Sequence, residues 1–432
     1  MGTVRLAAQP KRRLTKSHVA ATVRKSYEVE LGGIGAFLPQ RVPILDLPVV
    51  FSAYLSACGE LPARYPRRHG GVRAWLDREF RRDRADVRRA IAALDTGQSD
   101  ALMTALCALG HTYRWDSVPP VAARFDEHRV RLPPGIAGPW GVLANATGQP
   151  RVGSAWTLHL TNWQMTDRPG GAPYAPDELS RGSLRVARNW LAPPVDADLE
   201  SFSIAFVLME ASGAAVVRAI VEGIEHAGAR RVEETTGALH RLQSAIAAMT
   251  LGFSSNVRTR TIDPAVWLEL IQPTYAWAPR GGPSGMQLGT VQAIDAALGI
   301  GSRSALAKLA GSARRHMPPP HRRFLRTLDL AGPALRCFVQ ESRCDDLTDR
   351  FDACVAALGR FRGTHKARGA LYLRSRPPGD VGRASTGMTI GVHDEPLGTF
   401  ERSMDERIAE TQSGISRSSC RDCSAEPHVS HA

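Results

Sequence analysis

A stripe of apolar side chains with one histidine at its end most constrains how this chain can fold. Its members are four, three, four, three and four residues apart, which is the spacing of one face of an α-helix. An apolar helix face packs against a core, so the stripe predicts a long helix over residues 346–373 with this face buried. The stripe consists of Leu347, Phe351, Cys354, Leu358, Phe361 and His365.

The histidine of the stripe, His365, needs partners for two ring nitrogens in apolar surroundings. Iron in a haem group is one partner that can bind such a nitrogen. A buried histidine can equally be a core residue whose ring is hydrogen-bonded to a backbone carbonyl or a water. The spacing alone is compatible with both interpretations.

Other long segments of the chain also have helical character. Residues 200–227 are apolar nearly all round, which is typical of a helix that crosses the centre of a domain. Because this segment contains Glu210 and Arg218, we interpret it as a buried helix and not as a membrane span. Few segments alternate with period two, so the chain is predicted to be all-α.

Prolines and glycines mark the predicted boundaries between helices. Residues 131–140, RLPPGIAGPW, are predicted to form an irregular connector, because proline disrupts helix interiors. Upstream of it, one helix is predicted over residues 72–94. Asp263 and Pro264 are predicted to begin a further helix, as its cap and first-turn residue, and Pro273 is predicted to end it.

The strong positive charge of the chain raises the question of a nucleic-acid partner. The formal net charge is +13 at pH 7. The densest basic segment, residues 78–89, is interleaved with acidic residues and is therefore typical of a solvated helix face with paired charges. No motif that reads DNA or RNA accompanies it, so no nucleic-acid partner is predicted.

Seven cysteines are scattered along the chain, and this odd number without a secretory signal favours a reducing, cytoplasmic compartment. Cys420, Cys423 and His428 have the residue types of a zinc site. They lie in a serine-rich end without apolar residues to fold around a metal, so residues 412–432 are predicted to be a disordered tail. Residues 1–26, which are basic and poor in acidic residues, are predicted to be a flexible arm.

Several motifs occur in an order that resembles the indoleamine 2,3-dioxygenase family of haem proteins. The resemblance runs from about residue 27 to about residue 411. MPPPHRRFL together with the RFRGTH helix is its most specific part. The motifs are YEVELGGIGAFLP (27–39), RLPPGIAGPW (131–140), LTNWQ (160–164), GGPSGMQ (281–287), MPPPHRRFL (317–325) and FDACVAALGRFRGTH (351–365).

The resemblance implies a small N-terminal helical domain, residues 27–148, packed on a larger helical haem-binding domain, residues 149–411. It also implies haem b as the cofactor, with His365 as the axial ligand of the iron. Arg362 matches the arginine that faces a haem propionate in the family, and a guanidinium offers a carboxylate two parallel hydrogen bonds. Asp295 is expected to brace this polar edge. Ser284 and Gly285 match a turn that lines the haem pocket.

On the opposite face of the haem, the resemblance implies a substrate pocket with several departures from the family. Phe202 matches the phenylalanine that packs on the indole, and Phe206 stands where many members have serine. Ile271 occupies the position of the arginine that pairs with the carboxylate of the amino acid. Ala155 and Leu158 replace a tyrosine and a cysteine of well-known members.

Two further residues are expected at this pocket. His159 is a departure from the family that could hydrogen-bond bound oxygen or accept the indole N–H, and the alternative is a packed histidine that faces away from the haem. Thr386, in STGMT, resembles the threonine of a mobile loop that closes over the substrate. Ser385 and Met388 replace glycines of that loop.

The activity that the resemblance implies is a haem-dependent dioxygenase with O2 as co-substrate. It would insert both oxygen atoms across the indole C2–C3 bond of tryptophan or a related indoleamine and give an N-formylkynurenine-type product, as in tryptophan catabolism. The alternatives are a family relative acting on another indole in secondary metabolism, favoured by Ile271 and His159, a haem-binding protein without catalysis, and a helical protein without haem. A small indole is the expected partner, with no membrane partner, and a monomer is favoured.

Overall fold

The computed structural model describes residues 16–32, 34–65, 71–116, 130–275, 277, 282–374 and 396–415. Helices dominate this part of the chain, which confirms the predicted all-α class. Its sheet is one small antiparallel pair, β1 (Trp163–Met165) and β2 (Leu184–Val186), in which Trp163 lies opposite Val186.

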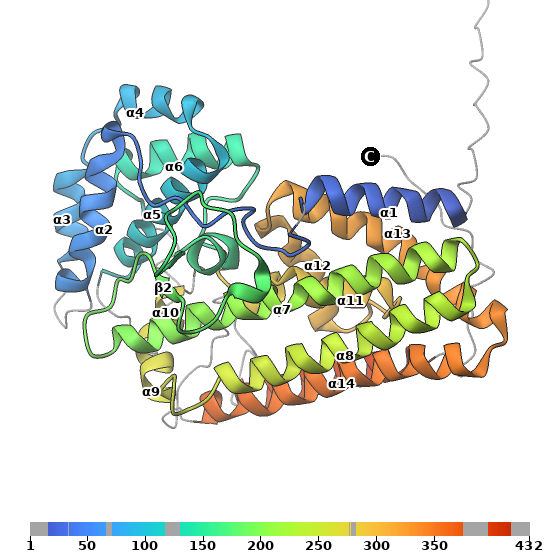
Figure 1. Ribbon diagram of the computed structural model, residues 1–432. Coiled ribbons are helices and arrows are strands. Elements are labelled where there is room, and N and C mark those ends of the chain that lie inside the picture. The colour runs from blue at the N-terminus through green and yellow to red at the C-terminus, as the bar shows by residue number, and fades with distance from the viewer. Residues whose placement is uncertain are drawn as a thin grey trace, which may run out of the picture.

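One group of helices comes from the first third of the chain and lies together on the left of Figure 1. At its centre is α5 (Thr96–Trp115), in which every residue from Ala101 onward is buried. Asp95 and Gln98 form a reciprocal capping box at the start of α5, which satisfies backbone N–H groups that the first helical turn leaves free. The other helices of the group are α2 (Ser52–Arg64), α3 (Val72–Glu79), α4 (Ala85–Ala90) and α6 (Pro134–Thr147).

A second group of longer helices forms a bundle on the right of Figure 1. The long helix α7 (Asp196–Gly228) contacts α1, α8, α11 and α13 of this bundle and also contacts β2. The other members are α1 (Lys16–Glu30), α8 (Val232–Asn256), α11 (Gly289–Ala297), α12 (Ala305–Ala313), α13 (Pro319–Ser342), α14 (Asp345–Arg374) and α15 (Pro396–Gln412). Two short helices, α9 (Pro264–Val266) and α10 (Gln272–Tyr275), flank a π-helical turn, Trp267–Ile271.

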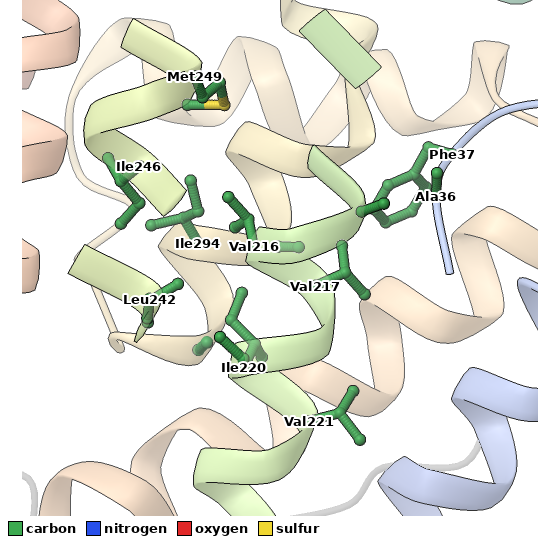
Figure 2. Close-up of a cluster of buried hydrophobic side chains, with 14 of the residues drawn as sticks. Ala36, Phe37, Val216, Val217, Ile220, Val221, Leu242, Ile246, Met249 and Ile294 are labelled. Carbon is green, nitrogen blue, oxygen red and sulfur yellow. The ribbon is translucent and has the colours of Figure 1, made fainter. Parts of the chain in front are cut away.

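The buried apolar side chains form two clusters, one for each group of helices. In the bundle, Val216 and Ile220 of α7 lie close to Ile246 of α8 and Ile294 of α11, while Phe37 lies on the side of Val217 (Figure 2). The second cluster surrounds α5 and also takes in Leu158, Ile271 and Tyr275. Helix α7 therefore connects two cores, because Leu199 at its start belongs to the second cluster.

The prediction of a flexible arm over residues 1–26 is wrong from residue 16 onward. Helix α1 begins at Lys16 and packs against α13 and α7. Val23 is fully buried, and the Arg24 guanidinium pairs with the Glu225 carboxylate of α7. Basic composition did not predict this packing, because two buried positions are enough to dock one face of the helix. Of the predicted tail, residues 416–432 lie outside the described residues.

Three predicted boundaries also differ from the structure. The helix predicted over residues 72–94 is divided into α3, α4 and a short 3-10 turn. The predicted connector is largely α6, in which Pro134 takes a first-turn position and Pro139 lies inside the helix, next to the fully buried Trp140. Pro273 does not end its helix, because the π-helical turn before it continues into α10.

Helix α7 is long and apolar enough to cross a membrane by length and composition. In the most apolar stretch of the helix, 72% is buried inside the protein, against the neighbouring helices. This burial agrees with its interpretation as a central core helix.

Candidate functional site

His365 lies on α14 among three aromatic rings. Its imidazole centroid is 5.8 Å from the ring of Phe253 on α8, 6.4 Å from Phe361 on α14 and 6.1 Å from Phe400 on α15. The residue is half-buried, and neither ring nitrogen has a hydrogen-bond partner among the residues that the structure describes. The alternative of a core histidine bonded to a backbone carbonyl therefore finds no support in the described part.

The surroundings of His365 favour its neutral form. Burial, assisted by the positive charge of Arg362, lowers the pKa of His365 to about 4. A neutral imidazole has a lone pair free on one ring nitrogen, which is what a metal ligand requires. An unpaired imidazole with this preference is compatible with an axial haem ligand.

One turn before His365 on α14, Arg362 belongs to a network of buried charges. The Arg362 guanidinium donates to the Asp295 carboxylate at 2.5 Å and to the Thr411 hydroxyl. Asp295 also accepts from Arg407 at 2.8 Å, and Arg407 donates to Glu410 at 2.5 Å. Asp295, on α11, thus joins arginines of α14 and α15. Sequence reasoning placed Arg362 and Asp295 together but missed Arg407 and Glu410.

The Ser284–Gly285 turn precedes α11 and is tied to the segment that carries Ala155. Ser284 Oγ accepts from the Met286 N–H at 3.3 Å and caps the short 3-10 turn Gly285–Gln287. The Gln287 side chain accepts from the Ala155 N–H at 2.6 Å and donates to the Gly282 carbonyl at 2.7 Å. Gly285 is exposed, and a side chain at this position would meet no atom of the described residues within 4 Å, so the turn is open on this side.

Glu210 of α7 holds the beginning of α11. Its carboxylate accepts from the Thr290 hydroxyl at 2.5 Å and from the Thr290 N–H at 3.3 Å. The residue is fully buried, and this burial raises the pKa of Glu210 to about 7. Sequence reasoning noticed Glu210 only as a charge inside an apolar helix, which was the signal of a buried, partnered carboxyl group.

His159 lies in a π-helical turn, Trp156–Leu160, and is almost completely buried, with 1% exposed. Its Nδ1 is 3.1 Å from the Ser203 hydroxyl of α7, while its Nε2 is buried without a partner among the described residues. Burial lowers the pKa of His159 to about 3, so the ring is neutral.

Aromatic rings surround His159. Phe206 stacks on its imidazole at 4.2 Å between centroids, and Phe202 and Tyr275 meet it edge-on at 5.6 and 5.1 Å. Both phenylalanines come from α7, one turn apart, and Tyr275 comes from α10. The structure therefore brings together His159, Phe202 and Phe206, which were predicted for the substrate pocket, and adds Tyr275.

The remaining predicted pocket residues are apolar and buried. Ala155, Leu158 and Ile271 each have no exposed surface. Leu158 and Ile271 share one hydrophobic cluster with Tyr275, and Phe202 packs against that cluster. Thr386 lies outside the described residues, so its predicted role stays a prediction.

A histidine that sequence reasoning missed aligns the segments of this region. His111 of α5 approaches the Thr274 carbonyl with Nδ1 at 2.9 Å and accepts from the Gly153 N–H with Nε2 at 3.0 Å. These bonds require a neutral ring with its proton on Nδ1. Burial lowers the pKa of His111 to about 3, which agrees with that form. One side chain thus holds the segment before Ala155 against α10.

Ring contacts connect the His159 region to α14. Phe202 is 6.3 Å from Trp267, and Trp267 is 5.5 Å from Tyr372 near the end of α14. Tyr372 lies two helical turns after His365. The series of ring contacts from His159 therefore reaches α14 and ends two turns from His365.

Comparison with known proteins agrees with this arrangement. The chain is 27% identical over 262 residues to indoleamine 2,3-dioxygenase 2 of Mus musculus, covering 56% of this chain and 62% of that protein. It is 24% identical over 421 residues to indoleamine 2,3-dioxygenase 1 of Mus musculus, covering 86% and 92%. A shorter match, 33% over 119 residues, covers 27% of this chain and 28% of a 6-hydroxytryptophan 2,3-dioxygenase of Fusarium equiseti.

A family model extends this similarity over most of the chain. The model for indoleamine 2,3-dioxygenase matches residues 25–278 and 263–376, which include His159, Asp295 and His365. Because these matches cover well over half of its length, the chain belongs to the indoleamine 2,3-dioxygenase family.

Proposed function

We propose that this protein is a haem-dependent dioxygenase that acts on an indole. The observation that carries the proposal is His365, an imidazole without a hydrogen bond in the described part of the chain, within the segment that the family model matches. Family membership supports the reaction class, and relatives named as dioxygenases of indoleamines and of 6-hydroxytryptophan support an indole ring as the reacting group.

The proposed cofactor is haem b, bound through His365. Arg362 would hold a propionate with those of its N–H groups that Asp295 and Thr411 leave free. The open space beside Gly285 would accommodate one edge of the flat macrocycle. When bound in the ferrous form, haem supplies the activation of O2.

The residues around His159 would bind and orient the indole. Phe202 and Phe206 offer ring faces and edges to an aromatic substrate. If Nδ1 of His159 carries the proton and donates to Ser203, Nε2 is left as an acceptor for the indole N–H. The buried apolar side chains nearby exclude water. Both atoms of O2 would enter the product as the indole C2–C3 bond breaks, giving an N-formylkynurenine-type compound.

The identity of the indole is open between tryptophan and a related compound. Ile271 favours the second, since a substrate carboxylate entering this apolar region without a charged partner would cost several kcal/mol. We also propose that Thr386 is part of a loop that closes over the substrate. The protein is further proposed to be monomeric and cytoplasmic.

The proposal is tested by reconstituting the protein with haem, reducing it and adding O2 with tryptophan, tryptamine or indole. We expect a Soret band in the reconstituted protein and, with at least one indole, the absorbance of a formylkynurenine-type product. A protein that binds O2 or CO and gives no product from any indole would instead be a haem-binding protein without catalysis. A preparation that stays colourless after haem is supplied would refute haem binding altogether.

A further inference from the structure

Three polar atoms in the region of His159 are buried without a partner among the described residues. They are Nε2 of His159, the hydroxyl of Tyr275 and Nε1 of Trp190. Buried polar groups are almost always hydrogen-bonded, because leaving one unpaired is costly. The ring of Tyr275 is 5.1 Å from His159 and 5.7 Å from Trp190, so the three unpaired groups come from adjoining rings.

Ser203 does not supply the missing hydrogen bonds. Its hydroxyl is 3.1 Å from His159 Nδ1. It also lies close to the Tyr275 hydroxyl and lowers the pKa of that phenol as a hydrogen-bond partner does, yet the phenol oxygen makes no hydrogen bond of normal geometry with any described residue. The pattern is typical of a binding site whose missing partner is a ligand that brings its own hydrogen-bonding atoms.

No charged side chain of the described residues acts on His159 or Tyr275. Among the described residues, no ion pair involves His159, Tyr275 or Trp190. Burial lowers the pKa of His159, and no charged side chain contributes to this shift. Burial likewise raises the pKa of Tyr275, again with no charged group contributing. Ile271, one turn before Tyr275, is apolar and fully buried. A charged ligand group placed here would lose its hydration without gaining a counter-ion.

We propose that this site selects indoles whose side chain is uncharged and can hydrogen-bond, and that the Tyr275 hydroxyl is the specificity-determining group. The phenol can both donate and accept, so it satisfies an alcohol, a carbonyl or an amide. Trp190 Nε1 adds a donor. The inference rests on the proposed function for the indole ring itself and goes beyond it in naming the class of side chain.

The test measures equilibrium binding by titration calorimetry to the haem-loaded protein with indoles that differ in side chain. The probes are 3-(2-hydroxyethyl)indole, 3-methylindole, tryptamine, indole-3-propionate and tryptophan. We expect the hydroxyethyl compound to bind at least about 10-fold more tightly than any of the three charged compounds, because burying an unpaired charge outweighs the extra contacts. A charged compound that binds as tightly as the hydroxyethyl compound overturns the inference.

The variant Tyr275→Phe tests whether the Tyr275 hydroxyl causes the preference for the hydroxyethyl compound. The variant should lose about 5-fold in affinity for 3-(2-hydroxyethyl)indole and keep its affinity for 3-methylindole, as expected for a single hydrogen bond. Equal changes for both ligands, or no change for either, overturn the assignment to Tyr275.

Tyr65→Phe is the matched control, because Tyr65 is equally buried and its hydroxyl already bonds Thr274 at 2.7 Å. Tyr65→Phe should lower the thermal midpoint and leave the ligand preference unchanged, whereas Tyr275→Phe should not lower the midpoint of the ligand-free protein. A lowered midpoint in Tyr275→Phe would mean that its hydroxyl already has a partner, and would refute the premise.

The outcomes separate this inference from the proposed function. Turnover of tryptophan with tight binding of tryptophan leaves the dioxygenase proposal intact and overturns only the selectivity. Failure of all five indoles to bind overturns both.

Discussion

The two histidines of the candidate site, His365 and His159, are both held neutral by burial but lie in opposite electrostatic surroundings. Near His365, Arg362, Asp295, Arg407 and Glu410 form a charged network that joins three helices. Around His159, the described neighbours are aromatic rings and one serine hydroxyl. Under the proposed function, Arg362 of the charged region would meet an anionic cofactor edge, and the region around His159 would hold an apolar ring. Burial thus sets the protonation state of each imidazole, while its neighbours decide what it can bind.

The largest expected difference between the two regions is in haem binding. His365→Ala should abolish stable haem binding, because it removes the proposed axial ligand. His159→Leu should retain haem, because that side chain is not proposed to bind the iron. The Soret absorbance of both variants after reconstitution and gel filtration measures the difference. Full Soret absorbance in His365→Ala would refute the ligand assignment.

The charged network is expected to contribute more to stability than a surface ion pair of the same helices. Asp295→Asn should lower the free energy of unfolding by about 3 kcal/mol, because it leaves the buried Arg362 without its carboxylate partner and Arg407 with Glu410 alone. Asp405→Asn is the control: Asp405 pairs with Lys366 of α14 at 2.7 Å, but its side chain is 60% exposed. This control should cost less than about 1 kcal/mol. If urea denaturation gave the same decrease in the free energy of unfolding for both variants, a special role for Asp295 would be contradicted.

Glu210 should make stability depend on pH in a direction unusual for a carboxyl group. Its pKa is raised from 4.5 to about 7 in the folded protein, so between these values the folded state holds a proton that the unfolded state has lost. Its contribution is therefore fully present below pH 4.5 and decreases as the pH rises through about 7. The total loss is of the order of 3 kcal/mol.

Glu210→Gln should remove this decrease, because the amide does not titrate. The measurement is the urea midpoint of both proteins between pH 4.5 and pH 8. A wild-type profile as flat as that of the variant would mean that Thr290 keeps the carboxylate charged in spite of its burial.

The smallest effect is expected for a substitution that places a cation in the region around His159. Ile271→Arg should improve the affinity for tryptophan by about 10-fold, or roughly 1.4 kcal/mol, if a missing carboxylate partner limits binding. Ile271→Met, which is apolar and of similar size, should leave that affinity unchanged. Calorimetric titration with tryptophan compares the two. No gain in the arginine variant would mean that the carboxylate is held elsewhere.

Features that depend on local spacing were predicted well. The helix predicted over residues 346–373 is observed as α14, Asp345–Arg374, and its apolar stripe from Leu347 to Phe361 is buried. The cap at Asp263 is confirmed, since its carboxylate accepts from the Ala265 N–H at 2.7 Å. Such features could be predicted because residues within one or two turns meet each other whatever the rest of the chain does.

Features that depend on distant contacts were predicted poorly. Pro139 and Pro273 were expected outside helix interiors, yet both lie within helices, Pro139 beside the buried Trp140 and Pro273 after a π-helical turn. The partners of His159 come from α7 and α10, and no spacing rule connects these segments. Arg407 could not be associated with Asp295 for the same reason.

The sequence by itself determined the helical class, the family and the face of α14 that carries His365, because each follows from the order and period of neighbouring residues. The tertiary structure alone decided which charges surround Arg362 and which polar atoms beside His159 have no partner. Those properties arise where helices far apart in the chain pack together, and there burial excludes the water that would otherwise satisfy every charge and every donor.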